Sequence, residues 1–256
     1  MTRLLSGVAL GAATLAAILL LPPVGLRVLA CLVAALASRE YLGVLHQNGK
    51  PPHLAPLLVL VVATCWWMSD VTPGPLLAVL LLGLGWLAVE VVFLGLTVDR
   101  AAARVLAQWY IGMPFGMLAA IESVAGRMGP LLLIATIAVS DSAQFYMGRL
   151  FGRRLLAPAI SPKKTVEGAV GGLVLAPVFV ALAGPALLPG AGRLSLALLG
   201  VIMVVLGIVG DLFESRLKRI AGVKDSSVII PGHGGILDRI DALLFATPAF
   251  YVYLQA

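Results

Sequence analysis

Acidic side chains occur inside segments of this chain that are otherwise apolar. Six are placed in this way: Glu40, Glu90, Asp141, Asp211, Asp238 and Asp241. A carboxylate at membrane depth is costly, so it usually faces the protein interior and has a partner there. For Glu90 and Glu40 we expect structural roles, with Glu40 paired to the adjacent Arg39. The C-terminal aspartates lie among other polar groups, which indicates chemistry.

The three last aspartates fall on two consecutive predicted helices. The first reads DLFESRLKR, and its helical spacing puts four side chains on one face: Asp211, Glu214, Ser215 and Lys218. The next carries Asp238 and Asp241, three residues apart on one face. Carboxylates this close repel unless a cation lies between them, and Mg²⁺ favours one or two carboxylates with phosphate and water. A magnesium site is predicted; the alternative is a salt-bridged bundle with Arg239 and Lys218.

Between these two helices lies the sequence PGHGG, residues 231–235. Proline can start a helix, and glycines let backbone amides approach a ligand closely. The positive end of the following helix would favour phosphate at the same place. His233 is either a phosphate contact or a histidine held by the loop itself.

A third group of polar residues surrounds a basic loop. Asp141 and Gly148 are seven residues apart near the end of one apolar segment, and Arg149 opens a loop rich in Arg and Lys. The sequence SPKKTVEG predicts a helix start with Thr165 as the cap. A basic, Thr-capped turn at a membrane surface suits a polyphosphate or a lipid phosphate. The loop could also serve only as a positive-inside signal.

The elements that carry these residues are long apolar runs. Mean hydropathy is +1.05, and 61% of the residues are hydrophobic, which excludes an ordinary soluble domain. The runs do not alternate as barrel strands do, so we predict an all-α polytopic membrane protein of about nine transmembrane helices. The predicted ranges are 4–22, 24–45, 53–69, 74–98, 108–122, 129–148, 167–184, 194–213 and 232–254.

Basic residues are distributed unequally between the two sets of loops. Fourteen of the 18 Lys and Arg residues, Arg100 and Arg104 among them, are assigned to the N-terminus and to the loops after the even-numbered ranges, counting Arg39 near the end of the second range. Three, Arg27, Arg127 and Arg193, are assigned to the opposite side. This bias predicts that the fourteen face the cytoplasm. The pI of 9.7 is then explained by orientation and anionic lipid rather than by nucleic acid. The first range is expected to be a retained anchor. We divide the chain into an N-terminal transmembrane region, 1–125, and a C-terminal catalytic region, 126–256.

The C-terminal pattern resembles the phosphatidate cytidylyltransferases, or CDP-diacylglycerol synthases. That family's motif runs S-x-hydrophobic-K-R, then K-D, then P-x-H-G-G-x-x-D-R-x-D. The chain matches it at Ser215, Lys218, Arg219, Lys224, Asp225, Pro231, His233, Gly234, Gly235, Asp238, Arg239 and Asp241. The resemblance extends upstream to Asp141, to Gly148-Arg149 and to ISPKKTVEG, which contains Ser161, Lys164 and Thr165. One departure is Gln144, where the family commonly has alanine.

The resemblance implies transfer of CMP from CTP to phosphatidic acid, giving CDP-diacylglycerol and pyrophosphate, with Mg²⁺ as cofactor. It implies metal binding by Asp211 and Asp238 with support from Asp241, and phosphate binding by Lys218, Arg219 and Lys224, with Arg239 also in the catalytic set. Substrate contacts are expected from the upstream residues and the glycine loop. It further implies a homodimer in the inner membrane, with its active site facing the cytoplasm.

Two other functions fit the same residue types. A CTP-dependent lipid-alcohol kinase would transfer the γ-phosphoryl group and leave CDP. A transporter would use the intramembrane acids for ions or protons, but it predicts paired repeats with broken spans, and the sequence shows no clear repeat.

Overall fold

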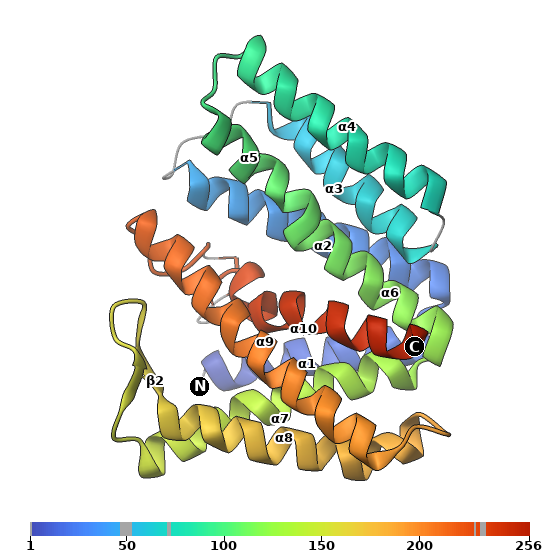
Figure 1. Cartoon of the computed structure of the whole chain (residues 1–256), viewed down its shortest axis with the longest axis vertical. Helices are drawn as coiled ribbons and strands as arrows, with labels where there is room; N and C mark the ends of the chain where they lie inside the picture. The colour runs from blue at the N-terminus through green and yellow to red at the C-terminus, as the bar shows by residue number, and fades with distance from the viewer. Residues whose placement is uncertain (1, 47–52, 71–72, 228, 231–233) are drawn as a thin grey trace. The chain divides into compact units, whose positions relative to one another are not determined.

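The computed structural model of the protein describes residues 2–46, 53–70, 73–227, 229–230 and 234–256 (Figure 1). Within these ranges the chain is helical apart from one short antiparallel hairpin, formed by β1 (Leu155–Ala157) and β2 (Ser161–Thr165). The expected all-α class is therefore confirmed. The chain divides into two compact units, each described here by itself.

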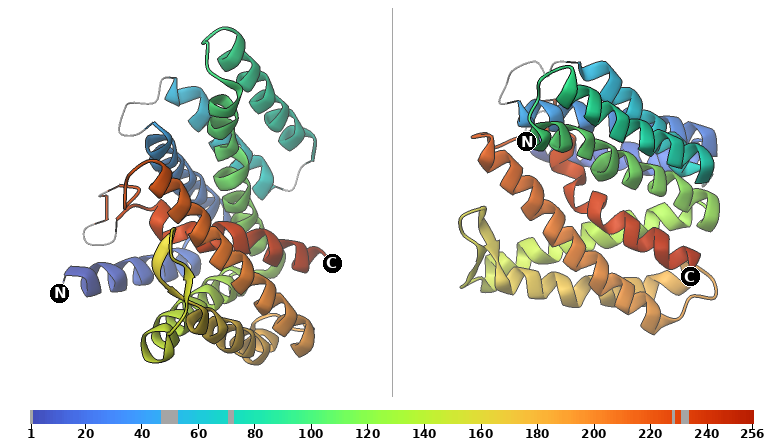
Figure 2. Two further views of the ribbon diagram at one scale, coloured as in Figure 1. Left: turned by 60° about the vertical axis from the view of Figure 1, so that its left-hand side comes forward. Right: turned by 45° about the horizontal axis from the view of Figure 1, so that its top comes forward.

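The first unit comprises Met1–Ala120 together with Ile220–Arg239. Its helices are α1 (Thr2–Leu20), α2 (Pro23–Leu45), α3 (Leu54–Ser69), α4 (Pro73–Val92), α5 (Val98–Ala107), the π-helical turn η1 (Gln108–Gly112) and the start of α6 (Met113–Ala125). Helix α3 packs between α2 and α4 (Figures 1 and 2). Helix α5 contacts α2, α3 and α4, and η1 contacts α2 and α3. Helix α6 also packs closely on α3: a methyl group on Gly116 of α6 would lie 2.6 Å from the Cys65 carbonyl oxygen of α3.

A buried ion pair lies inside this unit. Arg104 of α5 contacts the Glu90 carboxylate of α4 at 3.0 Å, and both side chains are at most 2% exposed. Trp86 donates a hydrogen bond to Glu90 at 2.9 Å, and Arg104 also contacts Nε2 of His46 at 3.1 Å. The structural role expected for Glu90 is confirmed. The assignment of Arg104 to a loop is wrong, because it lies in α5 and its charge neutralises Glu90 within the bundle.

The second unit comprises Ile121–Arg219 with Ile240–Ala256. Its helices are α7 (Met128–Phe151), α8 (Val166–Leu187), α9 (Arg193–Ile220) without its last residue, and most of α10 (Leu237–Gln255). Helices α7 and α8 lie side by side and are joined by the β1–β2 hairpin (Figures 1 and 2). The division predicted at residue 125 was a functional one and stays a prediction.

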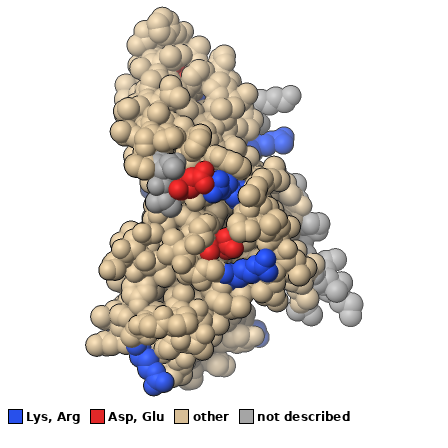
Figure 3. Space-filling model, turned by 90° about the vertical axis from the view of Figure 1, so that its right-hand side faces the viewer, with Lys and Arg blue, Asp and Glu red and all other residues tan. Residues whose placement is uncertain are grey.

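Five of the described helices are long and apolar enough to cross a membrane: α2, α4, α7, α8 and α9. Large apolar side chains such as Leu81, Leu82 and Leu84 of α4 are more than half exposed, as lipid-facing residues are. On the face in Figure 3, few charged side chains interrupt the uncharged surface. The protein is thus a multi-pass membrane protein. Each of the nine predicted ranges overlaps a helix, but the count of nine spans is not confirmed, because α3 has only 16 residues and α10 begins with charged ones.

Candidate functional site

The hairpin between α7 and α8 is fixed at the start of α8. Thr165 is the N-cap of α8, and its Oγ1 accepts a hydrogen bond from the Gly168 amide at 3.1 Å, as the sequence predicts. Glu167 Oε2 accepts bonds from the amides of Arg153 and Arg154 at 3.0 and 3.2 Å. The basic loop is therefore a structured hairpin rather than a loose charged tail.

Lys164 on β2 connects this hairpin to α9. Its ammonium lies 2.6 Å from Oδ2 of Asp211, and the two side chains are 20% and 33% exposed. Ser215 donates to Oδ1 of Asp211 at 3.2 Å, and Arg219 Nε donates to the Ile160 carbonyl at 3.3 Å. The predicted polar face of α9 is therefore real, and part of it meets the hairpin.

The remaining pair on α9 is internal to that helix. Lys218 contacts the Glu214 carboxylate at 2.5 Å, and the Glu214 side chain is only 1% exposed. Lys218 therefore forms a salt bridge, as the alternative considered above supposes, but its partner is Glu214 one helical turn away and not an aspartate. Lys218 thus acts in the structure by neutralising a buried acid, and its role toward phosphate stays a prediction.

Two other aspartates of the second unit act electrostatically on Asp241. The negative charges of Asp211 and Asp141 repel that of Asp241, and Lys164 attracts it. Helices α9 and α10 approach closely here, since a methyl group on Gly210 would lie 2.5 Å from the Asp241 carbonyl oxygen. The structure thus brings together Asp141 and Asp241, which the sequence placed on separate helices.

Asp238 holds the segment before α10. Its Oδ2 accepts hydrogen bonds from the Ser226 amide at 2.9 Å, the Ser226 hydroxyl at 2.9 Å and the Gly235 amide at 2.7 Å. Gly234 has φ of +80°, a conformation that side chains rarely adopt. Asp238 and Asp211 belong to different units, so a metal ion shared between them stays a prediction.

The partner predicted for Glu40 of α2 is wrong. The Glu40 carboxylate bonds not to Arg39, which is exposed, but to the segment before α10. It accepts from the hydroxyls of Ser226 and Ser227 at 3.0 and 2.6 Å, and from the amides of residues 236 and 237 at 3.1 and 2.8 Å. About 190 residues separate the partners, and no local signal in the sequence links them.

These bonds also change the expectation for the start of α10. The amides of Gly235, Ile236 and Leu237 donate to the carboxylates of Asp238 and Glu40. The helix end does bind negative charge, as its dipole favours. In this structure that charge comes from the protein, so a phosphate contacting these three amides would have to displace a carboxylate.

The other predicted residues are placed as follows. Arg149 is exposed in the last turn of α7, and Ser161, at the start of β2, is partly buried. Lys224 and Arg239 are exposed in the first unit, and His233 lies outside the described residues. Gln144, the departure from the family pattern, donates to Ser140 at 3.0 Å within α7. It packs against Gly172 of α8, so its role in the structure is packing.

The described residues include no group of three or more His, Cys, Asp or Glu side chains close enough to hold a metal ion. A cation would nevertheless relieve the repulsion that Asp241 receives from Asp211 and Asp141. Mg²⁺ commonly takes one or two carboxylates and completes its shell with water and substrate phosphate. The donor chemistry of Asp211 and Asp241 therefore fits Mg²⁺ with substrate oxygens.

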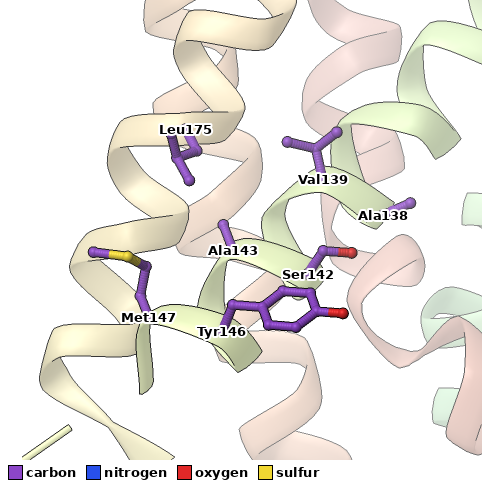
Figure 4. A pocket seen from close by; sticks show the side chains of 7 residues that line it. All are labelled: Ala138, Val139, Ser142, Ala143, Tyr146, Met147 and Leu175. Atoms are coloured by element: carbon purple, nitrogen blue, oxygen red, sulfur yellow. The ribbon is translucent and has the colours of Figure 1, made fainter. Parts of the chain in front are cut away.

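An apolar hollow lies on α7, with Leu175 contributed by α8 (Figure 4). Ser142 and Tyr146 supply the polar side-chain atoms drawn there, and the others are aliphatic or thioether groups. The surface suits hydrocarbon, as expected of a face that meets lipid.

Comparison with known proteins gives relatives that include several phosphatidate cytidylyltransferases and one uncharacterized protein. The chain is 47% identical over 130 residues to the phosphatidate cytidylyltransferase of Haemophilus influenzae, covering 48% of this chain and 45% of the relative. It is 39% identical over 139 residues to the uncharacterized protein YnbB of Escherichia coli, covering 54% and 46%. These alignments span about half the length of each relative.

A longer alignment joins the chain to the phosphatidate cytidylyltransferase of Pseudomonas aeruginosa. The two are 37% identical over 223 residues, which cover 82% of this chain and 79% of the relative. A model of the cytidylyltransferase family matches residues 1–256. Both findings extend the likeness beyond the C-terminal motif, and this chain therefore belongs to the cytidylyltransferase family.

Proposed function

We propose that this protein is a phosphatidate cytidylyltransferase, which transfers CMP from CTP to phosphatidic acid. The observation that carries the proposal is the family match over the whole chain, together with the Ser215–Asp241 motif. The names of the Haemophilus influenzae and Pseudomonas aeruginosa relatives support the same substrates. The product would be CDP-diacylglycerol in phospholipid biosynthesis.

In the proposed reaction a phosphate oxygen of phosphatidic acid forms a bond to the α-phosphorus of CTP. The bond from that phosphorus to the bridging oxygen of the β-phosphate breaks, and pyrophosphate leaves with the electron pair. A phosphate monoester is already ionised at neutral pH, so no strong general base is required. The protein must mainly hold two highly charged substrates together and neutralise their charge.

The residues of the second unit are suited to this task. Lys164 and Arg219 supply positive charge between the hairpin and α9, and Asp211 orients Lys164. Lys218, and Lys224 of the first unit, are further candidates for binding phosphate through their positive charge. We assign Mg²⁺ to Asp211, Asp238 and Asp241, where it would neutralise developing phosphate charge when bound.

The unequal distribution of Lys and Arg between the two sets of loops supports an active site that faces the cytoplasm, where CTP is found. The membrane would be the inner membrane of a bacterial cell. We also propose a homodimer, which rests on the family resemblance alone. Chemical crosslinking of the protein in membranes would test the dimer separately from the activity.

The activity is tested with purified protein in detergent or vesicles. Pyrophosphate release from CTP is expected only when both phosphatidic acid and Mg²⁺ are present. Release that is independent of phosphatidic acid would contradict the proposal. A requirement for a lipid alcohol in place of phosphatidic acid would assign the protein to the kinases.

A further inference from the structure

The Glu40 carboxylate occupies an unusual place for a residue of the N-terminal half. It is 5% exposed and accepts four hydrogen bonds from residues 226–237. Two donors are the hydroxyls of Ser226 and Ser227, and two are the backbone amides of residues 236 and 237, where α10 begins. One side chain thus binds residues on both sides of the glycine pair, Gly234 and Gly235.

The glycine pair fits this arrangement sterically. A methyl group on Gly235 would lie 2.4 Å from Glu40 Oε2 and 2.0 Å from the Ser226 hydroxyl oxygen. The loop backbone therefore lies directly against the carboxylate, with no side chain between them. Glycine at this position allows the contact, which gives it a purpose other than contact with a phosphate.

Glu40 and Asp238 are linked through a single hydroxyl. Ser226 Oγ lies 3.0 Å from Glu40 Oε2 and 2.9 Å from Asp238 Oδ2. A hydroxyl has one proton, so it can donate fully to only one of the two carboxylates at a time. The position of Asp238, which begins α10, is thereby tied to that of Glu40.

We infer that Glu40 is a positioning residue for the proposed active site. It holds residues 226, 227, 236 and 237 against α2, and through them fixes Asp238 and the start of α10. The role in turnover rests on the proposed function, whereas the mechanical role does not. Both carboxylate oxygens are needed as well as the shape of the side chain, because a carboxylate accepts at both oxygens and an amide accepts at only one.

The test compares Glu40→Gln with Glu90→Gln in the purified full-length protein. Both changes remove one buried carboxylate of the first unit, but Glu90 has no bond to this loop among its described contacts. Hydrogen–deuterium exchange is measured on peptides covering 226–237, with thermal stability measured in parallel. Glu40→Gln should speed exchange at residues 236 and 237 roughly tenfold or more, and Glu90→Gln should not.

Activity gives the second readout. In Glu40→Gln, kcat should fall at least about tenfold at saturating substrate, since small misplacements of a positioned group are costly. Glu90→Gln should keep the wild-type kcat even if it loses as much thermal stability as Glu40→Gln, or more. An unchanged rate of hydrogen–deuterium exchange at residues 236 and 237 in Glu40→Gln would overturn the inference that Glu40 holds this segment. Faster exchange with unchanged kcat would overturn its role in turnover.

Should Glu40→Gln fail to fold, Ser227→Ala removes one donor at 2.6 Å and leaves the carboxylate in place. Its loop exchange should be severalfold faster. In the double variant with Glu40→Gln, where that can be made, the serine change should add nothing further. Wild-type exchange in Ser227→Ala would contradict the inference. If the wild-type protein were inactive on CTP and phosphatidic acid, the proposed function would be refuted. The exchange comparison would still show whether Glu40 holds residues 226–237 in place.

Discussion

The contact between α7 and α8 leaves no room for a methyl group at Gly168. An ideal Cβ there would lie 2.6 Å from the Gln144 carbonyl oxygen and 3.0 Å from the Thr165 hydroxyl. Ordinary van der Waals contact begins at 3.4 Å, so the first distance is 0.8 Å too short. Gln144 contributes a backbone atom of α7, which cannot rotate away, so Gly168→Ala must move one helix relative to the other.

The expected cost follows from two opposing effects. Overpacking of this kind typically costs about 1–3 kcal/mol. Alanine in place of glycine favours the helix by about 1 kcal/mol. Gly168→Ala should therefore lower the free energy of unfolding by about 0–2 kcal/mol. Because Gly168 donates to the Thr165 cap, the shift should also displace the hairpin and Lys164, and activity should fall several-fold.

The matched control is Gly43→Ala on α2, where nothing lies within 4 Å of the added methyl. It keeps the helix-propensity gain without the clash, so it should be neutral or stabilising. Thermal unfolding in detergent and turnover with CTP and phosphatidic acid compare the two variants. If Gly168→Ala were as stable and as active as Gly43→Ala, the close packing of α7 on α8 would not position the hairpin.

Three further changes test other parts of the account. Asp211→Asn should reduce kcat roughly 10²-fold, because it removes a charged group from the proposed metal and phosphate site, and circular dichroism should show retained helix. Glu90→Gln leaves the Arg104 charge buried without its counter-ion and should cost about 3 kcal/mol of stability, measured by thermal unfolding, with turnover kept. A cysteine at position 163 should be protected from an impermeant thiol reagent in intact cells, and one at position 255 should react; the reverse would refute the orientation. Cys31 and Cys65 are buried and should give little background.

The sequence predicted the helices well because apolar length is a strong and local signal. All nine ranges overlap helices, and the cap at Thr165 was recognised from a short local pattern. The polar stripe on α9 was also correct, since side chains three and four residues apart must share a helical face. Local rules thus located the residues of the candidate site.

The long-range partners could not be predicted in the same way. Nothing near Glu40 indicates that its donors lie at residues 226–237, and the adjacent Arg39 suggested a false partner. Arg104 looked like a loop cation because α5 is short and polar, but burial and Glu90 gave it an internal role. Asp238 and Lys218 were predicted from their charge to act on ligands, whereas their described partners belong to the protein. Pairing of buried charges depends on tertiary packing, which spacing in one sequence does not encode.

The central claim is that the cytidylyl group, and not the terminal phosphoryl group, moves to the lipid. Purified protein is incubated with Mg²⁺, phosphatidic acid and CTP radiolabelled at either the α- or the γ-phosphate, and the lipid is extracted. The account predicts label in the lipid from α-labelled CTP only, with the γ-label recovered as pyrophosphate. Lipid labelled from the γ-phosphate, with CDP as the soluble product, would contradict it.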